Sequence, residues 1–470
     1  MSQETRSPAA SLGLLDATMV GMGAMIGAGI FVLTGLAADI AGPAAILVFA
    51  LNGVVTAFTG LSYAELASAI PKSGGGYAFV EEVFSDSVSF LMGWMLWFAY
   101  MIAGALYALG FASNFVEFVR LYWPGLPTGA VVAGGPQWHV VYALLVVVGF
   151  VSLNALSTSA SGGAETAVTL VKIAILLVFV AFGVFAADAG HFSPLFPGGR
   201  SAASLLPAMG LTFIAFEGYD LITTVTEEVK NPRENIPKAI FLSLAATVVI
   251  YLLVVFVAIG TLGADQLGAA GETAIAQAAE TFMPRLHVVG TGAALVAFGA
   301  VFSTISALNA VVLASSRIAF AMGRDRLFPA VLGRLHPRYG TPYAAVLASA
   351  VVMLLSVAFV PIQQVGNLSS LFFLLSFVVV NASVVKLRRE RPNLRRPYEM
   401  PFYPVPPVLG ILLNLVLGFF IDPTTWAMGL GWLALGGATF VVSRRAGGLV
   451  GPDGDDDGDD SDGATDHRRQ

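Results

Sequence analysis

The chain has 470 residues, of which 56% are hydrophobic and only 11% are charged, and its mean hydropathy is +0.79. A soluble domain carries about 25% charged residues, so this composition excludes an ordinary soluble protein and predicts an all-α polytopic protein of the lipid bilayer. Cysteine is absent, and the net charge is −6. Disulfides and thiolate metal sites are therefore excluded, and no cofactor, metal or nucleic acid partner is expected.

Twelve stretches are apolar over roughly the 20 residues that cross a hydrocarbon core. In chain order they are Leu14–Ile40, Pro43–Ala67, Ser87–Val119, Val140–Leu156, Ala164–Ala187, Leu205–Thr226, Ile236–Thr261, Val288–Ala319, Pro342–Val360, Val365–Val385, Val405–Ile421 and Thr425–Ser443. Residues 1–13 precede them and lack the features of a signal peptide, which predicts a short N-terminal tail.

The basic residues are distributed very unequally between the connections. Of the 24 lysines and arginines, 20 lie in the two tails and in the turns that follow even-numbered spans, and three lie in the other connections. Cytoplasmic loops carry an excess of lysine and arginine, so this bias predicts an even number of spans with both termini in the cytoplasm.

The first span contains the segment GMGAMIGAGIF, with glycines at 21, 23, 27 and 29. Each glycine inside a helix costs up to about 1 kcal/mol relative to alanine, so four of them predict a helix that breaks within the membrane. Irregular backbone at that depth must be buried in protein or line a cavity. Close packing of small residues against a neighbouring helix is the alternative explanation.

The fifth span carries Lys172 inside the apolar run 167–184, with no other ionisable residue between Glu165 and Asp188. A lysine at the centre of a membrane helix costs roughly 2.5–3.5 kcal/mol, and such residues usually face a polar cavity on an ion or proton route. We therefore expect Lys172 to have a functional partner inside the bundle.

The sixth span, LTFIAFEGYDLITTVTEEV, places Glu217, Gly218 and Asp220 in an otherwise apolar stretch. Two interrupted spans that stand five helices apart are expected when two inverted five-helix repeats enclose a substrate site. The last span is followed by residues 444–470, in which eight aspartates carry the negative charge. Since this segment has few apolar residues to bury, it predicts a disordered acidic cytoplasmic tail.

At these residues the chain resembles the amino acid–polyamine–organocation (APC) transporter superfamily, and within it the proton-coupled and cationic amino acid transporter-like members. The segments that carry the resemblance are GMGAMIGAGIF (21–31), SYAELASAIPKSGGGYAFVEEVF (62–84), FIAFEGYDLITTVTEEVKNPRENIPKAI (213–240) and SALNAVVLASSRIAFAMGRDRLFP (306–329). The resemblance implies twelve transmembrane helices in a LeuT-like five-plus-five inverted repeat, with the first and sixth helices broken. Residues 14–187 and 205–386 would be the repeats, and 405–443 two appended spans.

The resemblance also implies where an amino acid binds. The substrate carboxylate would accept hydrogen bonds from the backbone N–H groups of Gly27, Ala28 and Gly29, since a helix N-terminus supplies free donors and a partial positive charge. The carbonyls expected to take the substrate ammonium are those near Met25, Ile26, Phe213, Ala215 and Phe216.

Four further residues of the sixth span belong to the implied site. Phe216 is expected to cap the substrate, with Tyr219 as second choice, and Gly218 to mark the break. Glu217 departs from the usual apolar residue of the superfamily. Together with Asp220 it would serve a cationic side chain or take up a proton, unless Glu217 points away and hydrogen-bonds to another helix.

In proton-coupled members a lysine of the fifth helix stands where sodium-coupled relatives bind a sodium ion, and Lys172 resembles it. Its implied partners are a carbonyl near Gly23 or Ala24. A hydroxyl of the eighth helix completes the implied set, from Ser303, Thr304 or Ser306. Such a lysine would gain and lose a proton during transport. The alternative is a lysine that stays charged and only braces the bundle.

These features predict a secondary active transporter of the cytoplasmic membrane, not an enzyme, that moves amino acids together with protons. An exchanger of amino acids or polyamines is the nearest alternative. A substrate sensor or channel of the same fold is the alternative from another class, because broken helices bind solutes whether or not transport follows. The substrate, the stoichiometry and the oligomeric state do not follow from the sequence.

Overall fold

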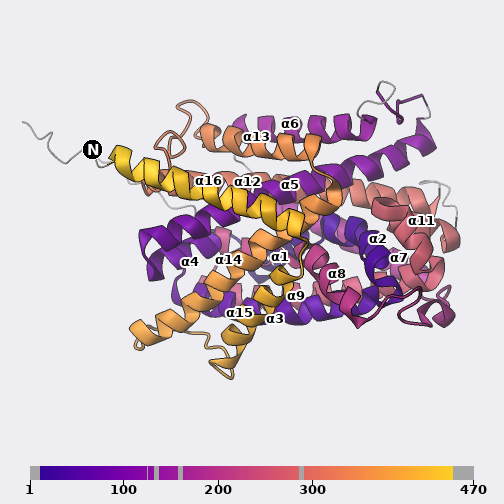
Figure 1. The fold of residues 1–470 in the computed structure, drawn as a ribbon, viewed down its shortest axis with the longest axis horizontal. Coiled ribbons are helices and arrows are strands. Elements are labelled where there is room, and N and C mark those ends of the chain that lie inside the picture. The colour runs from indigo at the N-terminus through magenta and orange to yellow at the C-terminus, as the bar shows by residue number, and fades with distance from the viewer. Residues whose placement is uncertain (1–10, 124, 132–136, 157–161, 285–290, 448–470) are drawn as a thin grey trace, which may run out of the picture.

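The computed structural model describes residues 11–123, 125–131, 137–156, 162–284 and 291–447 and consists of helices joined by short connections (Figure 1). The α-helices are α1 (Leu14–Met25), α2 (Ala28–Ala41), α3 (Ala45–Ala69), α4 (Gly75–Val83), α5 (Asp86–Tyr122), α6 (Trp138–Leu156), α7 (Gly162–Gly183), α8 (Leu205–Thr212), α9 (Pro232–Leu262), α10 (Ala264–Ala270), α11 (Ala274–Phe282), α12 (Gly292–Arg324), α13 (Tyr343–Phe359), α14 (Ile362–Glu390), α15 (Val405–Phe419) and α16 (Pro423–Gly447). The 3-10 helices are η1 (Gly42–Ala44), η2 (Ala189–Phe192), η3 (Ala202–Ser204), η4 (Phe213–Phe216), η5 (Asp220–Glu228) and η6 (Gly271–Thr273).

Within these residues, nine helical stretches are long and apolar enough to cross a membrane, and α13 and α15 are shorter apolar helices. Large apolar side chains lie exposed on the outside of the bundle, among them Leu145 on α6, Phe298 on α12 and Val442 on α16. Water would penalise so much exposed apolar surface, whereas lipid hydrocarbon does not. The protein is therefore an all-helical, multi-pass membrane protein.

Among the described residues, each of the twelve apolar stretches predicted from the sequence overlaps with helix, and the first and sixth are interrupted. The segment between α9 and α12 was not predicted to be helical. It forms α10, η6 and α11, which are much shorter than a membrane span and therefore invisible to a search for long apolar runs. Most of the two predicted tails, residues 1–10 and 448–470, lies outside the described residues.

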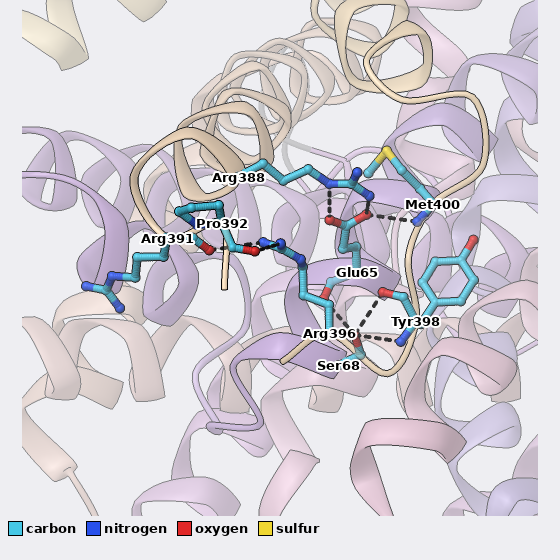
Figure 2. Close-up of polar contacts among 8 residues, drawn as sticks. All are labelled: Glu65, Ser68, Arg388, Arg391, Pro392, Arg396, Tyr398 and Met400. Atoms are coloured by element: carbon cyan, nitrogen blue, oxygen red, sulfur yellow. Dashed lines mark hydrogen bonds and ion pairs between the residues drawn. The ribbon is translucent and has the colours of Figure 1, made fainter. Parts of the chain in front are cut away.

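Lys72, Arg388 and Arg391 pair with acidic residues of α3 and α4 and define what we call the basic end of the bundle. Figure 1 shows α4 at one end of the bundle and α11 at the opposite end. Figure 2 shows an ion pair at the basic end, in which both Arg388 Nε and Nη2 donate to Glu65, at 2.7 and 2.8 Å. The connection between α14 and α15 contacts this ion pair through Met400, whose N–H donates to Glu65 at 2.9 Å.

At the opposite end, α10, η6 and α11 pack on α2 through small residues. A Cβ atom at Gly35 would lie 2.1 Å from the carbonyl oxygen of Gly271, and one at Gly268 would lie 2.9 Å from the Cα of Asp39. Only glycine allows two backbones to approach this closely. This contact closes the bundle at the end away from Lys72.

Candidate functional site

The first break separates α1 from α2 at Ile26 and Gly27. The Gly27 backbone has φ −116° and ψ −134°, which is far from helical geometry, and helix resumes at Ala28. A break of this kind leaves carbonyl groups at the end of one helix and N–H groups at the start of the next without partners in their own helix. Of the three predicted carboxylate donors, the Gly27 N–H already donates to the Met25 carbonyl at 2.7 Å, and Ala28 and Gly29 lie in the first turn of α2.

The second break follows η4, at Glu217 and Gly218. Glu217 is extended, with φ −75° and ψ 144°, and Gly218 has φ +131°, which side chains other than glycine rarely tolerate. The chain then resumes as η5 at Asp220. Both interruptions predicted from the glycine and carboxylate pattern are thus present in the helices.

The two breaks touch each other at two points. A Cβ atom at Gly218 would lie 2.6 Å from the Met25 nitrogen, and one at Gly29 would lie 2.6 Å from the Cα of Ala215. Residues far apart in the chain therefore meet backbone to backbone at the centre of the bundle. The predicted donors and acceptors of both broken helices share one location.

Carbonyls freed by the breaks already accept hydrogen bonds from buried side chains. The Lys172 ammonium donates to the Gly23 carbonyl at 2.8 Å, and the Ser303 hydroxyl donates to the Ile26 carbonyl. The Tyr251 hydroxyl lies 2.6 Å from the Met25 carbonyl oxygen and 3.0 Å from the Ala215 carbonyl oxygen, so it bridges the two breaks.

Lys172 lies on α7 and is completely buried where α7 packs against α1. Gly23 is the partner expected for it, whereas the predicted hydroxyl partners make other bonds. The Thr304 hydroxyl donates to carbonyls of its own helix, and the Ser306 hydroxyl lies 3.3 Å from Glu165. Glu165, about two helical turns before Lys172 on α7, is a nearby counter-charge for the ammonium.

Ala24, the other predicted neighbour of Lys172, faces the second break instead. It lines a small cavity of about 10 Å³, between α5 and α12, that is also lined by Glu217. The full lining comprises Ala24, Tyr100, Ala103, Tyr107, Glu217, Gly218, Leu221, Ala307, Val311 and Phe373. Gly27 is not part of this lining but lies next to two residues of it, since a Cβ there would lie 2.7 Å from Ala307 and 3.5 Å from Tyr107.

The two carboxylates of the second break have different surroundings. Asp220 accepts a hydrogen bond from the Tyr100 hydroxyl, and the Gly218 N–H donates to it at 3.0 Å. Glu217 is 3% exposed, and neither of its carboxylate oxygens has a hydrogen-bond partner among the described residues. A buried charge without a partner is strongly disfavoured, so Glu217 needs a cation or a proton.

The predicted aromatic residues lie on other sides of the break. The Phe216 ring packs against Phe49 and Tyr251, with centroids 6.0 and 5.4 Å away. Tyr219 packs against Tyr63, and Phe213 is fully buried in the core. Within the described chain, none of the three predicted aromatic residues lines the cavity that is lined by Glu217.

A larger cavity of about 250 Å³ opens at the basic end, between α4, η5 and α12. Charged residues at its wall include Glu227, Glu228 and Arg317. Glu227 is held to the loop before α4, because its N–H donates to the Ser73 hydroxyl at 3.1 Å and its carboxylate accepts from the Ser73 N–H at 3.4 Å. Thr224, Glu227 and Glu228 of η5 line this cavity, so it lies on the η5 side of the second break.

Sequence reasoning missed Tyr251, Tyr100 and Tyr107, which lie on α9 and α5 and contact the breaks or the cavity. Aromatic residues are common in membrane helices, so single tyrosines gave no signal. Glu165 was noted only as the start of the apolar run, and its closeness to Lys172 on one helix face was not used. Spacing of seven residues, two turns of helix, could have identified that pair.

Comparisons with known proteins agree on one kind of protein. A family model described as amino acid permease matches residues 12–435. The chain is 30% identical to a methylthioribose transporter of Bacillus subtilis (strain 168), with 94% of this chain and 95% of the relative covered. It is also 30% identical to the branched-chain amino acid permease BcaP of the same organism, over 92% and 93%, and 27% identical to BcaP of Lactococcus lactis subsp. cremoris (strain MG1363), over 91% and 93%.

Proposed function

The chain belongs to the amino acid permease family, in the APC superfamily, and is a transporter rather than an enzyme; we propose that it carries amino acids across the cytoplasmic membrane by secondary active transport driven by protons. The observation that carries the proposal is the buried Lys172 ammonium, which donates to the Gly23 carbonyl beside the first break. Because the ammonium carries a proton and bonds to the backbone at the first break, protonation of Lys172 is coupled to the conformation of the proposed substrate site.

We propose that the fold is a twelve-span arrangement in which residues 14–187 and 205–386 are inverted repeats and 405–443 are two appended spans. The two breaks stand five spans apart and meet at the centre of the bundle, as inverted repeats require. The excess of lysine and arginine in the tails and even connections supports cytoplasmic termini. The basic end would then face the cytoplasm.

In this proposal the Lys172 ammonium replaces a metal cation. With its proton, Lys172 holds α7 to the end of α1, because an ammonium is a strong donor to a carbonyl. Without its proton, it loses the charge that strengthens this bond, and α1 is free to move relative to α7. The Ser303 hydroxyl on α12 donates to the carbonyl of Ile26, three residues after Gly23. This turn of backbone is therefore bonded to both α7 and α12.

The substrate route follows from which end is closed. The α10 to α11 segment is packed on α2 at one end, whereas the cavity of about 250 Å³ opens at the basic end. In this proposal the packing of α10 and η6 on α2 is the outer seal, and release occurs towards the cytoplasm. Alternating access requires the same contacts to open and close in turn.

A proteoliposome assay tests transport and coupling together. Reconstituted protein is given neutral and cationic amino acids and methylthioribose, the substrate that one relative is named for, under an imposed pH gradient or an imposed sodium gradient. We expect saturable uptake of amino acids driven by the pH gradient and independent of sodium. Binding without flux or counterflow would instead indicate a sensor, and flux that needs a substrate on both sides would indicate an exchanger.

Lys172→Ala isolates the coupling step. We expect it to abolish uptake driven by the pH gradient, because the cation beside the first break is lost. Lys238→Ala is the matched control, since Lys238 is exposed at the start of α9 and pairs only loosely with Glu234, at 3.8 Å. Sodium dependence of the wild type, or pH-driven uptake that is unchanged in Lys172→Ala, would contradict the coupling proposal.

A further inference from the structure

Glu217 is the acceptor that the second break leaves unpaired. Its side chain is 3% exposed, and both of its oxygens lack a hydrogen-bond partner among the described residues. By contrast, the carbonyls of Gly23, Ile26 and Met25 each accept a bond from Lys172, Ser303 or Tyr251. The strongest free acceptor beside the breaks is therefore a carboxylate and not a backbone carbonyl.

From this contrast we infer that the Glu217 carboxylate receives the α-ammonium group of the substrate, a role that rests on the proposed amino acid transport. The Ala215 carbonyl is also in contact with the Tyr251 hydroxyl. The sixth span therefore offers the Glu217 side chain to the ammonium, where its backbone carbonyls were expected to bind it. A bond between two charged groups is roughly twice as strong as one between neutral groups.

The same cavity offers donors for the other end of an amino acid. Gly27 lies next to Tyr107 and Ala307, which line the cavity, and α2 begins at the residue after Gly27. The N-terminus of α2 supplies N–H groups and a partial positive charge for the substrate carboxylate. Glu217 and the start of α2 thus present opposite charges to the two charged groups of a zwitterion.

The number of free carboxylates sets the substrate class. Asp220 is already bonded by Tyr100 and by the Gly218 N–H, which leaves Glu217 as the one unpaired carboxylate among the described residues of the cavity. One carboxylate neutralises one ammonium, and a cationic side chain would need a second. Apart from Tyr100 and Tyr107, the other side chains of the wall are apolar, including Val311 and Phe373. The site therefore selects neutral amino acids with apolar side chains over lysine and arginine.

Other titratable groups face Glu217 without neutralising it. Tyr100 and Tyr107 approach from α5, Tyr63 from α3, and Tyr219 and Asp220 from its own segment. None of these side chains is a cation. At about 10 Å³ the cavity holds roughly one water molecule. Admission of an amino acid therefore requires its walls to move apart, as expected when a transporter opens to one side.

The test compares amino acids with analogues that lack the amino group. L-Leucine and L-alanine are measured against 2-hydroxyisocaproate and L-lactate by competition for uptake into proteoliposomes, with L-lysine as the cationic probe. In the wild type we expect the amino acids to compete at least about 100-fold better than their hydroxy analogues, since a site built around a charged hydrogen bond rejects ligands that cannot make it. We expect L-lysine to compete poorly.

Glu217→Gln keeps the shape of the side chain and removes its charge. We expect the affinity for the amino acids to fall at least about tenfold, in line with the loss of a bond to a charged group, while that for the hydroxy analogues changes little. Glu217→Asp, with the charge on a shorter side chain, should give an intermediate value. Glu234→Gln, an exposed glutamate on α9, is the control.

The outcomes separate this inference from the function on which it rests. A wild type that takes up no amino acid contradicts the proposed function. A wild type that takes up amino acids, together with a Glu217→Gln variant that still rejects the hydroxy analogues to the same degree, overturns the role of Glu217. Uptake of L-lysine in preference to L-leucine by the wild type overturns the substrate class. If Glu217→Gln fails to fold, Glu217→Asp and the wild-type comparison still decide.

Discussion

At the scale of single residues, Tyr251 is the side chain that ties both breaks to a third helix. Its hydroxyl lies 2.6 Å from the Met25 carbonyl oxygen and 3.0 Å from that of Ala215, and its ring packs on Phe49 and Phe216. All of these groups are buried, so water cannot replace the hydroxyl. An unsatisfied buried acceptor costs about 1–3 kcal/mol.

Tyr251→Phe should therefore destabilise the site while keeping the ring contacts. We expect the free energy of unfolding to fall by about 1–3 kcal/mol, because the one hydroxyl donor that the two buried carbonyls share is lost, and the maximal uptake rate to fall with it. Thermal unfolding in detergent and proteoliposome uptake measure the two effects. Tyr142→Phe is the matched control, since the Tyr142 hydroxyl donates to the Pro127 carbonyl at an exposed position. Equal effects of both variants would argue against a special role for Tyr251.

Single residues differ in how far the sequence predicts them. Lys172 and the glycines of the first span were recognisable from the sequence. A charge or a cluster of glycines in an apolar helix costs much free energy, so its presence indicates a structural or functional role. Tyr251 carries no such cost in a membrane helix and could not be singled out. Glu217 was recognisable as unusual, but its lack of a partner depends on Asp220 taking the Tyr100 hydroxyl, which only the three-dimensional structure reveals.

At the scale of elements, the seal at the end away from Lys72 depends on glycine. Gly35 on α2 faces Gly271 in η6 and Ala274 at the start of α11, with a Cβ position only 2.1 Å from the Gly271 carbonyl oxygen. Backbone atoms cannot yield as a flexible side chain can. Even a methyl group at Gly35 would thus keep η6 and α11 from seating on α2.

Gly35→Ala should leave this end of the bundle open. The chain contains no cysteine, so a single Ala274→Cys reports accessibility without background. Ala274 is fully buried against α2, and we expect a membrane-impermeant maleimide to label it slowly alone and several-fold faster in combination with Gly35→Ala. Gly149→Ala on α6, where a Cβ meets nothing within 4 Å, is the control. Unchanged labelling in the Gly35 variant would show that this contact is not the seal.

The elements themselves were largely predictable, since long apolar runs have few alternatives to membrane helices. The conformation of the sixth span was predictable only as an interruption. It runs as 3-10 helix on both sides of Glu217, where η4 packs on α2 and α14 and η5 packs on α1 and α9. The short helices α10 and α11 depend on packing against α2, and hydropathy alone carries no information about that contact.

At the scale of the whole molecule, charge links distant parts of the chain at the basic end. Glu65 on α3 pairs with Arg388 on α14, and Glu82 on α4 pairs with both Lys72 and Arg391. The excess of basic residues at this end was predictable from the positive-inside rule. Their acidic partners were not, because the pairs Glu65–Arg388 and Glu82–Arg391 join residues more than 300 positions apart.

Glu82 should make the stability of the basic end depend on pH. Hydrogen bonds from Arg391 and Lys72 hold the pKa of Glu82 below its usual value of 4.5. A carboxylate with a lowered pKa in the folded state stabilises the protein at pH values above 4.5, and this stabilisation is lost as the pH falls through the lower folded value. The contribution is about 1 kcal/mol or less, because Lys72 and Arg391 are about half exposed to solvent.

Glu82→Gln removes the charge at every pH, so its difference from the wild type should itself depend on pH. We expect the variant to unfold at a lower temperature than the wild type at pH 7, and the two melting temperatures to converge as the pH is lowered below 4.5, since the wild-type carboxylate is then protonated. High salt should narrow the gap at pH 7 by screening the exposed pairs. Glu234→Gln, in a looser exposed pair, should show a smaller gap. A gap that persists unchanged at low pH would mean that Glu82 acts through packing and not through its charge, and that the basic end is held by the Glu65–Arg388 pair alone.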